Sequence, residues 1–472
     1  MALLAAAAVG LGALVLFVHL ERQGRAAAVF TVLLAELLVE CVLYPDQSVV
    51  PVGLVHPGAG ALSFRLAEFL VAVAIVARLV VRGAPSTVGV RMLWWAAFLV
   101  WMATAAVAGI LAGNDAGLAA FEAKAVVYLG AMAIGAGVSL RSMAGEHSLL
   151  RLLRWSGGLA ALLIVTDQAG IRLTFAVPLL PVQELGLIGG DLATVFSTLG
   201  ALCVVLAATG RRIDLLAAAA VLFAASVASE QRAGMVAAGL TLVVVALGLT
   251  LVPRRPRVTG TELLLTTTLA FGLVVAPSLA RVVAGEPARL PLAADLESAF
   301  SSTGKRQSAE SRANQWDQAK DLILERPLVG RGLGTTYAYF QSGPDEQVET
   351  NLTHNLLTDV ALRMGFVGLF LFLAATGLSL CDGWRAWRRH PDPMVAALAL
   401  GAFGGIVGIL GKAMFESIFE KYRIAILLGL LLGILRSAAS SLASDGAGVP
   451  PEPAGRPVAG AGDEWAGAGH AR

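Results

Sequence analysis

The chain has 472 residues, of which 57% are hydrophobic and only 14% are charged, and its formal net charge at pH 7 is +2. Soluble domains carry about 25% charged residues, so this composition excludes an ordinary water-soluble globular protein. Apolar runs of about 20 residues, the length that crosses the hydrocarbon core of a bilayer, recur along almost the whole chain. We therefore expect an all-α, polytopic transmembrane helix bundle.

The candidate membrane spans follow one another from the first residues onward. They cover residues 2–19, 26–43, 62–81, 91–112, 123–140, 150–166, 190–209, 213–229, 232–252, 261–281, 365–381, 394–411 and 422–436. This makes thirteen spans, and twelve is the natural alternative because 213–229 and 232–252 are hardly separated. The first run lacks a basic start and a clear cleavage site, which predicts a retained helix rather than a signal peptide.

Basic residues gather in every second loop. Cytoplasmic loops retain Lys and Arg, so this alternation predicts an N-terminus outside and a C-terminus inside. One short loop departs from the pattern, because Lys412, Lys421 and Arg423 fall on the predicted outer side with Glu416 and Glu420. The basic loops carry Arg22, Arg25, Arg78, Arg82, Arg91, Arg141, Arg151, Arg154, Arg211, Arg212, Arg254, Arg255, Arg257, Arg385, Arg388 and Arg389.

This pattern divides the chain into four parts. We expect an N-terminal transmembrane bundle over 1–282, a large and mostly helical periplasmic loop over 283–364, and C-terminal transmembrane helices over 365–436. Residues 437–472 are rich in Ala, Gly, Pro and Ser, which predicts a disordered cytoplasmic tail.

The first regular element expected in the long outer loop is an amphipathic helix. Residues 308–326 repeat apolar side chains at helical spacing, among them Trp316 and Ile323, and Pro327 ends the run. A second, short helix is expected from an N-cap at Thr353 to about Gly365, where the next span begins.

The turn between these two helices contains Gly330, Gly332 and Gly334, and Arg331 is available there for an anion. It resembles a phosphate loop only in its glycines, because the Lys-Ser/Thr ending and a βαβ setting are missing. In the second helix, the i, i+4 spacing of Asp359 and Arg363 predicts an ion pair.

A few polar residues could carry chemistry. Arg232 lies at the outer end of a span, where it either faces a polar cavity or extends to the membrane surface. Arg312 lies one helical turn before Trp316, which places a cation beside an aromatic ring, although a solvated helix face would look the same. His354 has an ordinary pKa near 6.5 and could accept a proton at neutral pH, or be a surface residue.

Further charges fall inside the apolar runs. Glu36 and Glu40 lie one turn apart, and Arg65 lies close to Glu68. They either form a proton or ion pathway or make polar contacts between helices. The chain has no zinc-ligand spacing and no catalytic serine motif, so we expect no metal site.

The order of these motifs resembles the O-antigen ligase/polymerase family of bacterial membrane glycosyltransferases. That family has an Arg…Trp element, a P-x-x-G-x-G-x-G turn and a His-Asn pair in a long periplasmic loop. This chain has Arg312-Ala-Asn-Gln-Trp316, then Pro327-Leu-Val-Gly330-Arg-Gly332-Leu-Gly334, then His354-Asn355, directly before an apolar span. The upstream Ser229-Glu-Gln-Arg232 is a looser match, since two residues separate Ser from Arg. The resemblance covers roughly residues 225–380.

The resemblance implies a reaction at the outer face of the bacterial cytoplasmic membrane. The donor is a glycan on a polyprenyl diphosphate, and the acceptor is a hydroxyl of a glycan or lipid. The lipid diphosphate is already a good leaving group, so no nucleotide is needed and we expect no cofactor. The lipid bilayer is the remaining partner, and we expect no nucleic acid among the partners.

The resemblance also suggests a role for each candidate residue. Arginine binds phosphate oxygens in a bidentate manner, so Arg232 and Arg312, with Arg331 as a weaker candidate, are expected to bind the diphosphate. Trp316 and Asn355 are expected to bind substrate, and His354 to act as the general base. A ligase is preferred over a polymerase. The alternatives are a secondary transporter, which would predict inverted repeats, and a non-catalytic polysaccharide-assembly protein.

Overall fold

The computed structural model describes most of the predicted bundle and part of the loop. The described residues are 2–23, 25–43, 66–82, 90–135, 147–168, 173–175, 183–185, 189–210, 212–228, 232–251, 303–341, 346–351, 353–418 and 421–446. The predicted span at 261–281 lies outside these ranges and remains a prediction. The predicted disordered tail, 437–472, is wrong for residues 437–446, which continue the helix that begins at Tyr422, and its part beyond 446 lies outside the described ranges.

The described residues form a helical bundle, which confirms the predicted all-α polytopic fold. Eight of its helices are long and apolar enough to cross a bilayer, namely α4, α5, α7, α8, α10, α14, α15 and α16. The helices are α1 (Ala2–Arg22), α2 (Ala26–Leu43), α3 (Leu66–Arg82), α4 (Val90–Leu111), α5 (Ala116–Gly135), α7 (His147–Gln168), α8 (Gly190–Gly210), α9 (Ile213–Ala228), α10 (Arg232–Leu251), α13 (Thr303–Glu325), α14 (Leu356–Arg389), α15 (Pro393–Ala413) and α16 (Tyr422–Gly446).

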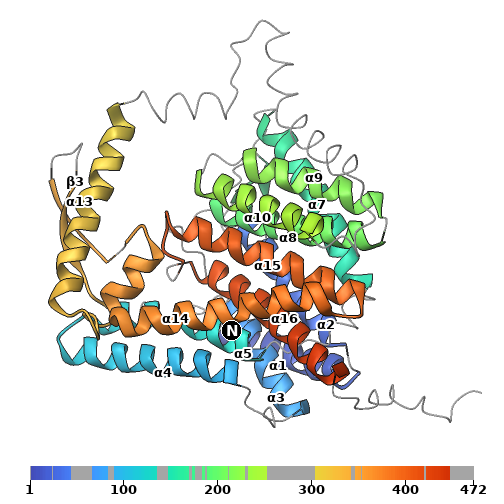
Figure 1. The fold of residues 1–472 in the computed structure, drawn as a ribbon, viewed down its shortest axis with the longest axis horizontal. Helices are drawn as coiled ribbons and strands as arrows, with labels where there is room; N and C mark the ends of the chain where they lie inside the picture. Colours follow the sequence, from blue (N-terminus) through green and yellow to red (C-terminus); the bar gives the residue numbers. More distant parts are fainter. Residues whose placement is uncertain are drawn as a thin grey trace, which may run out of the picture.

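The core of the bundle is built around α8, α15 and α16, whose side chains are mostly buried. Figure 1 shows α8, α9 and α10 on one side of α15, and α4 and α5 on the other side of α14 and α16. Helices on the rim keep apolar side chains exposed, such as Val100, Trp155 and Val243. Because water does not favour such surfaces, these side chains mark the faces that meet lipid.

Ion pairs between helices agree with the predicted alternation of helix direction. At the predicted inner ends, Arg78 lies 3.7 Å from Glu21 and Arg154 lies 2.6 Å from Asp214. Toward the predicted outer ends, Lys124 lies 2.7 Å from Glu68. In each pair, the alternation places both partners in the same half of the bundle.

The predicted loop contains more than helices. The amphipathic helix α13 begins at Thr303, five residues earlier than predicted. A β-hairpin that the sequence analysis missed follows it, with β3 (Tyr337–Gln341) antiparallel to β4 (Glu346–Thr350). A second short hairpin, β1 (Leu173–Phe175) with β2 (Gln183–Leu185), precedes α8.

The start of α14 corrects one prediction. The N-cap is Asn355, not Thr353, because the Asn355 side chain accepts from the backbone N–H groups of Leu357 and Thr358. The short helix meets the membrane span at Gly365, as predicted, because the backbone there leaves helical geometry with φ 66° and ψ −175° and makes a kink. Only glycine adopts this φ readily, so Gly365 lets the short outer segment and the membrane span form one bent element.

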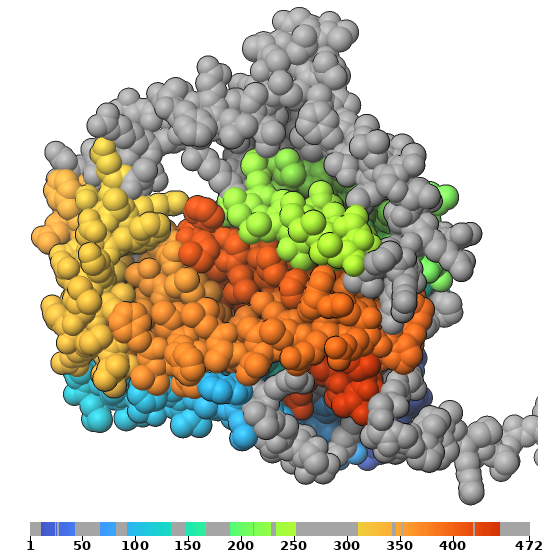
Figure 2. All heavy atoms as spheres, viewed as in Figure 1, coloured from blue at the N-terminus to red at the C-terminus, as the bar shows by residue number. Residues whose placement is uncertain are grey.

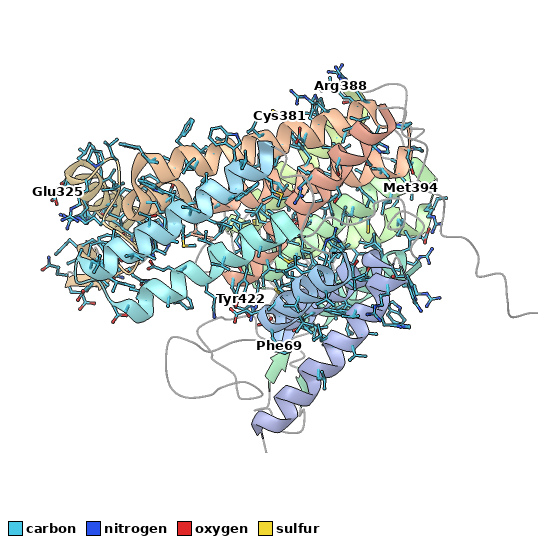
Figure 3. All side chains as sticks on the ribbon, turned by 90° about the horizontal axis from the view of Figure 1, so that it is seen from below. Phe69, Glu325, Cys381, Arg388, Met394 and Tyr422 are labelled. Carbon is cyan, nitrogen blue, oxygen red and sulfur yellow. The ribbon has the colours of Figure 1, made fainter. Side chains whose placement is uncertain are left out.

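α13 stands at one end of the bundle, across the direction of α4 and α14 (Figure 1). Figure 3 shows Glu325, the last residue of α13, at the opposite end of the molecule from Arg388 and Met394. The α13 region and the basic α14–α15 turn therefore lie at opposite ends of the helices, as a chain that crosses a membrane requires.

Candidate functional site

His354 lies in the short segment between β4 and α14. It is half-buried, and its backbone N–H donates to Oε1 of Gln315 on α13, with an N···O distance of 3.4 Å. Gln315 is itself buried. The histidine backbone is therefore held between the hairpin, α14 and the α13 helix.

Asn355 fixes the segment that carries His354. Its Oδ1 accepts from the N–H groups of Leu357 at 2.9 Å and Thr358 at 3.1 Å. Its Nδ2 donates to the backbone oxygen of Met414, in the turn after α15, at 3.2 Å. Because both ends of this side chain are engaged, Asn355 holds the start of α14 against the turn after α15.

Of the arginines predicted to bind the diphosphate, Arg312 is the one whose charge acts on His354. It lies on α13, three residues before Gln315, and is exposed. The pKa of His354 lies below its ordinary value of 6.5, first because of burial and then because of the positive charge of Arg312, with Lys421 acting in the same direction and Glu416 against it. A lowered pKa keeps the imidazole neutral at neutral pH, which is the form that accepts a proton.

Apolar side chains are exposed next to these polar groups. Trp316 on α13 is exposed, as are Met414 and Phe415 in the turn after α15. Figure 2 shows the surface hollowed between α13, in yellow, and the helices α10 and α15, in green and red-orange. A substrate with both charged and apolar parts could be accommodated there.

Arg232 is the first residue of α10, and nothing is described of its side chain. Its helix end lies near the same turn after α15, because a Cβ at Gly411 would be 3.7 Å from Cγ1 of Val236. Val236 follows Arg232 by one helical turn. The backbone of Arg232 is therefore placed at the same end of the bundle as Met414.

Arg331 is separated from these groups. Its guanidinium pairs with Glu325, the last residue of α13. Thirteen residues separate Glu325 from Arg312, which at the helical rise corresponds to about 20 Å along the helix axis. The structure therefore brings Arg312 and Asn355 to His354, but places Arg331 at the far end of α13.

A buried polar network supports the start of α14. Asp359 accepts from Ser417 Oγ at 2.7 Å and from Arg363 Nε at 2.7 Å, which confirms the predicted ion pair of Asp359 and Arg363. Arg363 also pairs with Glu122 on α5. The network joins α14 to α5 and to the turn after α15.

Ion pairs within the protein explain the basic residues of the loop 412–423, which departed from the predicted charge pattern. Buried Lys412 lies 3.0 Å from Asp191 at the start of α8, and Lys421 lies 2.5 Å from Glu416. Burial alone would lower the pKa of Lys421, but Asp191 and Glu416 raise it well above its ordinary value. These cations are therefore held within the protein, so they carry little information about the side of the membrane.

Two of the charges predicted inside apolar runs make contacts between helices. Glu40 accepts from Tyr422 and lies 3.6 Å from Arg423 on α16, and Glu68 pairs with Lys124 on α5. Gln315, Glu416 and Lys421 were not recognised as site residues from the sequence. Only the positions of Lys421 and Glu416 in the outer loop that departs from the charge pattern gave any signal.

The fold and this cluster define a multi-pass membrane protein with a polar site at one end of its helices. No group of three or more possible metal ligands occurs among the described residues. Residues 198–373 match the family model described as O-antigen ligase. This confirms the resemblance to the O-antigen ligase/polymerase family and supports a membrane glycosyltransferase of that type. The search of curated proteins finds no match.

Proposed function

We propose that the protein transfers a glycan from a polyprenyl diphosphate carrier to a hydroxyl group at the outer face of the bacterial cytoplasmic membrane. The observation that carries the proposal is the placement of Arg312 and a neutral, half-buried His354 together at one end of a membrane bundle. Both residues fall in the segment 198–373 that matches the O-antigen ligase model.

The proposed reaction needs one proton acceptor and at least one cation. His354 takes the proton of the acceptor hydroxyl as its oxygen bonds to the anomeric carbon of the glycan. The bond from that carbon to the diphosphate oxygen breaks, and the polyprenyl diphosphate leaves with the bonding electrons. Arg312 and Arg232 stabilise the negative charge that develops on the leaving diphosphate.

The other residues have supporting roles in this scheme. Gln315 and Asn355 position His354, and Trp316 provides an aromatic surface for the sugar. Arg331 is paired with Glu325 at the far end of α13, so its proposed role is in the glycine turn rather than in diphosphate binding. The hollow between α13 and the α10–α15 helices is the proposed entrance for the lipid-linked donor (Figure 2).

A ligase is preferred over a polymerase, and the same donor chemistry serves both. The test is an assay in liposomes with purified protein, a lipid-linked oligosaccharide and a hydroxyl acceptor, in which released polyprenyl diphosphate is measured. Release without any solute gradient is expected. A protein that releases no diphosphate but moves a solute across the membrane would instead be a transporter.

A further inference from the structure

The end of α13 and the turn that follows carry apolar side chains that face outward. Leu324, Leu328 and Val329 are 59%, 65% and 53% exposed. They adjoin exposed Phe366 and Phe370 on α14, since the N–H of Phe366 donates to the oxygen of Pro327 at 2.7 Å. We refer to Leu324, Leu328, Val329, Phe366 and Phe370 as the outer apolar patch.

The turn lies beside a membrane span rather than beyond its end. The N–H of Leu333 donates to the oxygen of Ala105 in α4 at 3.3 Å. The candidate span in α4 runs from Met92 to Leu111, so Ala105 lies six residues before its end. At the helical rise this corresponds to about 9 Å along the span.

The patch is continuous with surfaces that meet lipid. Phe370 belongs to the candidate span in α14, and its ring makes an edge contact with Trp94 of α4, with centroids 5.8 Å apart. Near the turn, α4 exposes Val107, Ile110 and Leu111, all apolar. One apolar surface therefore runs from the two spans onto the turn.

The backbone of the turn is paired within the protein. Five consecutive N–H groups, from Gly330 to Gly334, donate to protein acceptors. Their acceptors are the backbone oxygens of Arg326, Leu362, Arg363 and Ala105 and the carboxylate of Glu122. Irregular backbone is tolerated at membrane depth only when its polar groups are satisfied in this way.

We infer that the outer apolar patch is inserted into the bilayer leaflet on this side, with the exposed side chains of Glu325 and Arg326 reaching the level of the lipid headgroups. The predicted outer loop, 283–364, is then not wholly in water. This insertion fixes the depth of α13, and with it the level of Arg312 relative to the lipid headgroups. The inference does not depend on the proposed reaction.

The test measures the surroundings of single nitroxide labels in liposomes. Leu328→Cys and Val329→Cys are labelled in a Cys381→Ser background, since Cys381 is exposed whereas Cys41 and Cys203 are buried. Oxygen, which concentrates in lipid, and a water-soluble nickel chelate are compared as relaxing agents. Val243→Cys on the exposed face of α10 is the lipid control, and Gln347→Cys on β4 is the water control.

We expect labels at Leu328 and Val329 to behave like the Val243 label, with high oxygen and low nickel accessibility. Nickel accessibility equal to that at Gln347 would overturn the inference. Low accessibility to both agents would also overturn it, because protein, such as a second copy of the chain, would then cover the patch.

Discussion

The side-chain oxygen of Gln315 accepts a hydrogen bond from the backbone N–H of His354, at 3.4 Å. This contact joins the helix that carries Arg312 to the segment that carries the proposed base. Because Gln315 is buried, water cannot easily replace it.

Replacing Gln315 by Ala should slow glycan transfer without abolishing it. Loss of one hydrogen bond costs about 0.5–1.5 kcal/mol, so a decrease of roughly 2- to 13-fold in kcat is expected. The measurement is diphosphate release at saturating donor. Gln318→Ala is the matched control, because Gln318 lies one turn further along α13 and is exposed. Equal rates in the two variants would remove Gln315 from the positioning role.

The pH dependence of kcat/KM should change with the charges around His354. The base must be neutral, so kcat/KM should fall as the pH drops through the His354 pKa, which lies below 6.5. Arg312→Gln removes a cation that lowers this pKa, so the acid limb should move to higher pH. Glu416→Gln removes the opposing anion, so the limb should move to lower pH.

Two control variants separate charge from other effects in the pH profiles. Arg312→Lys keeps the charge, so its acid limb should stay near that of the unchanged protein even if the rate falls. Lys320→Gln removes an exposed charge from the same helix and should leave the limb in place. If Arg312→Gln leaves the limb unmoved, Arg312 does not act on His354.

The buried ion pair between Arg363 and Glu122 should matter for stability. Glu122→Gln removes one of the two buried carboxylates that pair with Arg363 and leaves Asp359 as the remaining partner charge, so we expect a cost of about 1–3 kcal/mol. Asp214→Asn breaks the exposed pair with Arg154 and should cost about 0–1 kcal/mol. The midpoint of thermal unfolding in detergent compares them, and similar midpoints would show that the network does not stabilise the fold.

Gly365 should not tolerate a side chain. A Cβ there would lie 2.2 Å from the oxygen of Leu328, and the combination of φ 66° with ψ −175° costs a non-glycine residue about 1–3 kcal/mol more. Gly377→Ala on the same helix is the control, since nothing lies within 4 Å of its Cβ position. We expect little folded Gly365→Ala protein and normal yields of Gly377→Ala, measured by size-exclusion chromatography. Equal yields would mean that the kink is not needed.

The sequence was most informative where the physical signal is periodic and long. The apolar runs predicted the bundle, and the i, i+4 spacing of Asp359 and Arg363 predicted their ion pair correctly. The β3–β4 hairpin was missed because its strands are short. Part of its support is also non-local, since Asn314 Nδ2 of α13 donates to the oxygen of Phe340 at 3.0 Å.

Contacts between separate elements explain the remaining differences between the predictions and the structure. Thr353 and Asn355 are both good N-cap residues, and only the structure distinguishes them. Arg331 was predicted to be available for an anion. Its partner Glu325 lies six residues earlier, on another element, so the sequence did not indicate the ion pair. Gln315 had no sequence signal, since a single polar residue on a helix looks the same whether it faces His354 or water.

The most direct test of the account is the effect of His354→Ala on polyprenyl diphosphate release in liposomes. We expect a decrease of about 10²–10⁴-fold with normal amounts of folded protein. Gln347→Ala on the exposed face of β4 should have no effect. In cells, accumulating long lipid-linked chains would identify a ligase and single repeat units a polymerase. Diphosphate release by His354→Ala at the rate of the unchanged protein would contradict the assignment of His354 as the base.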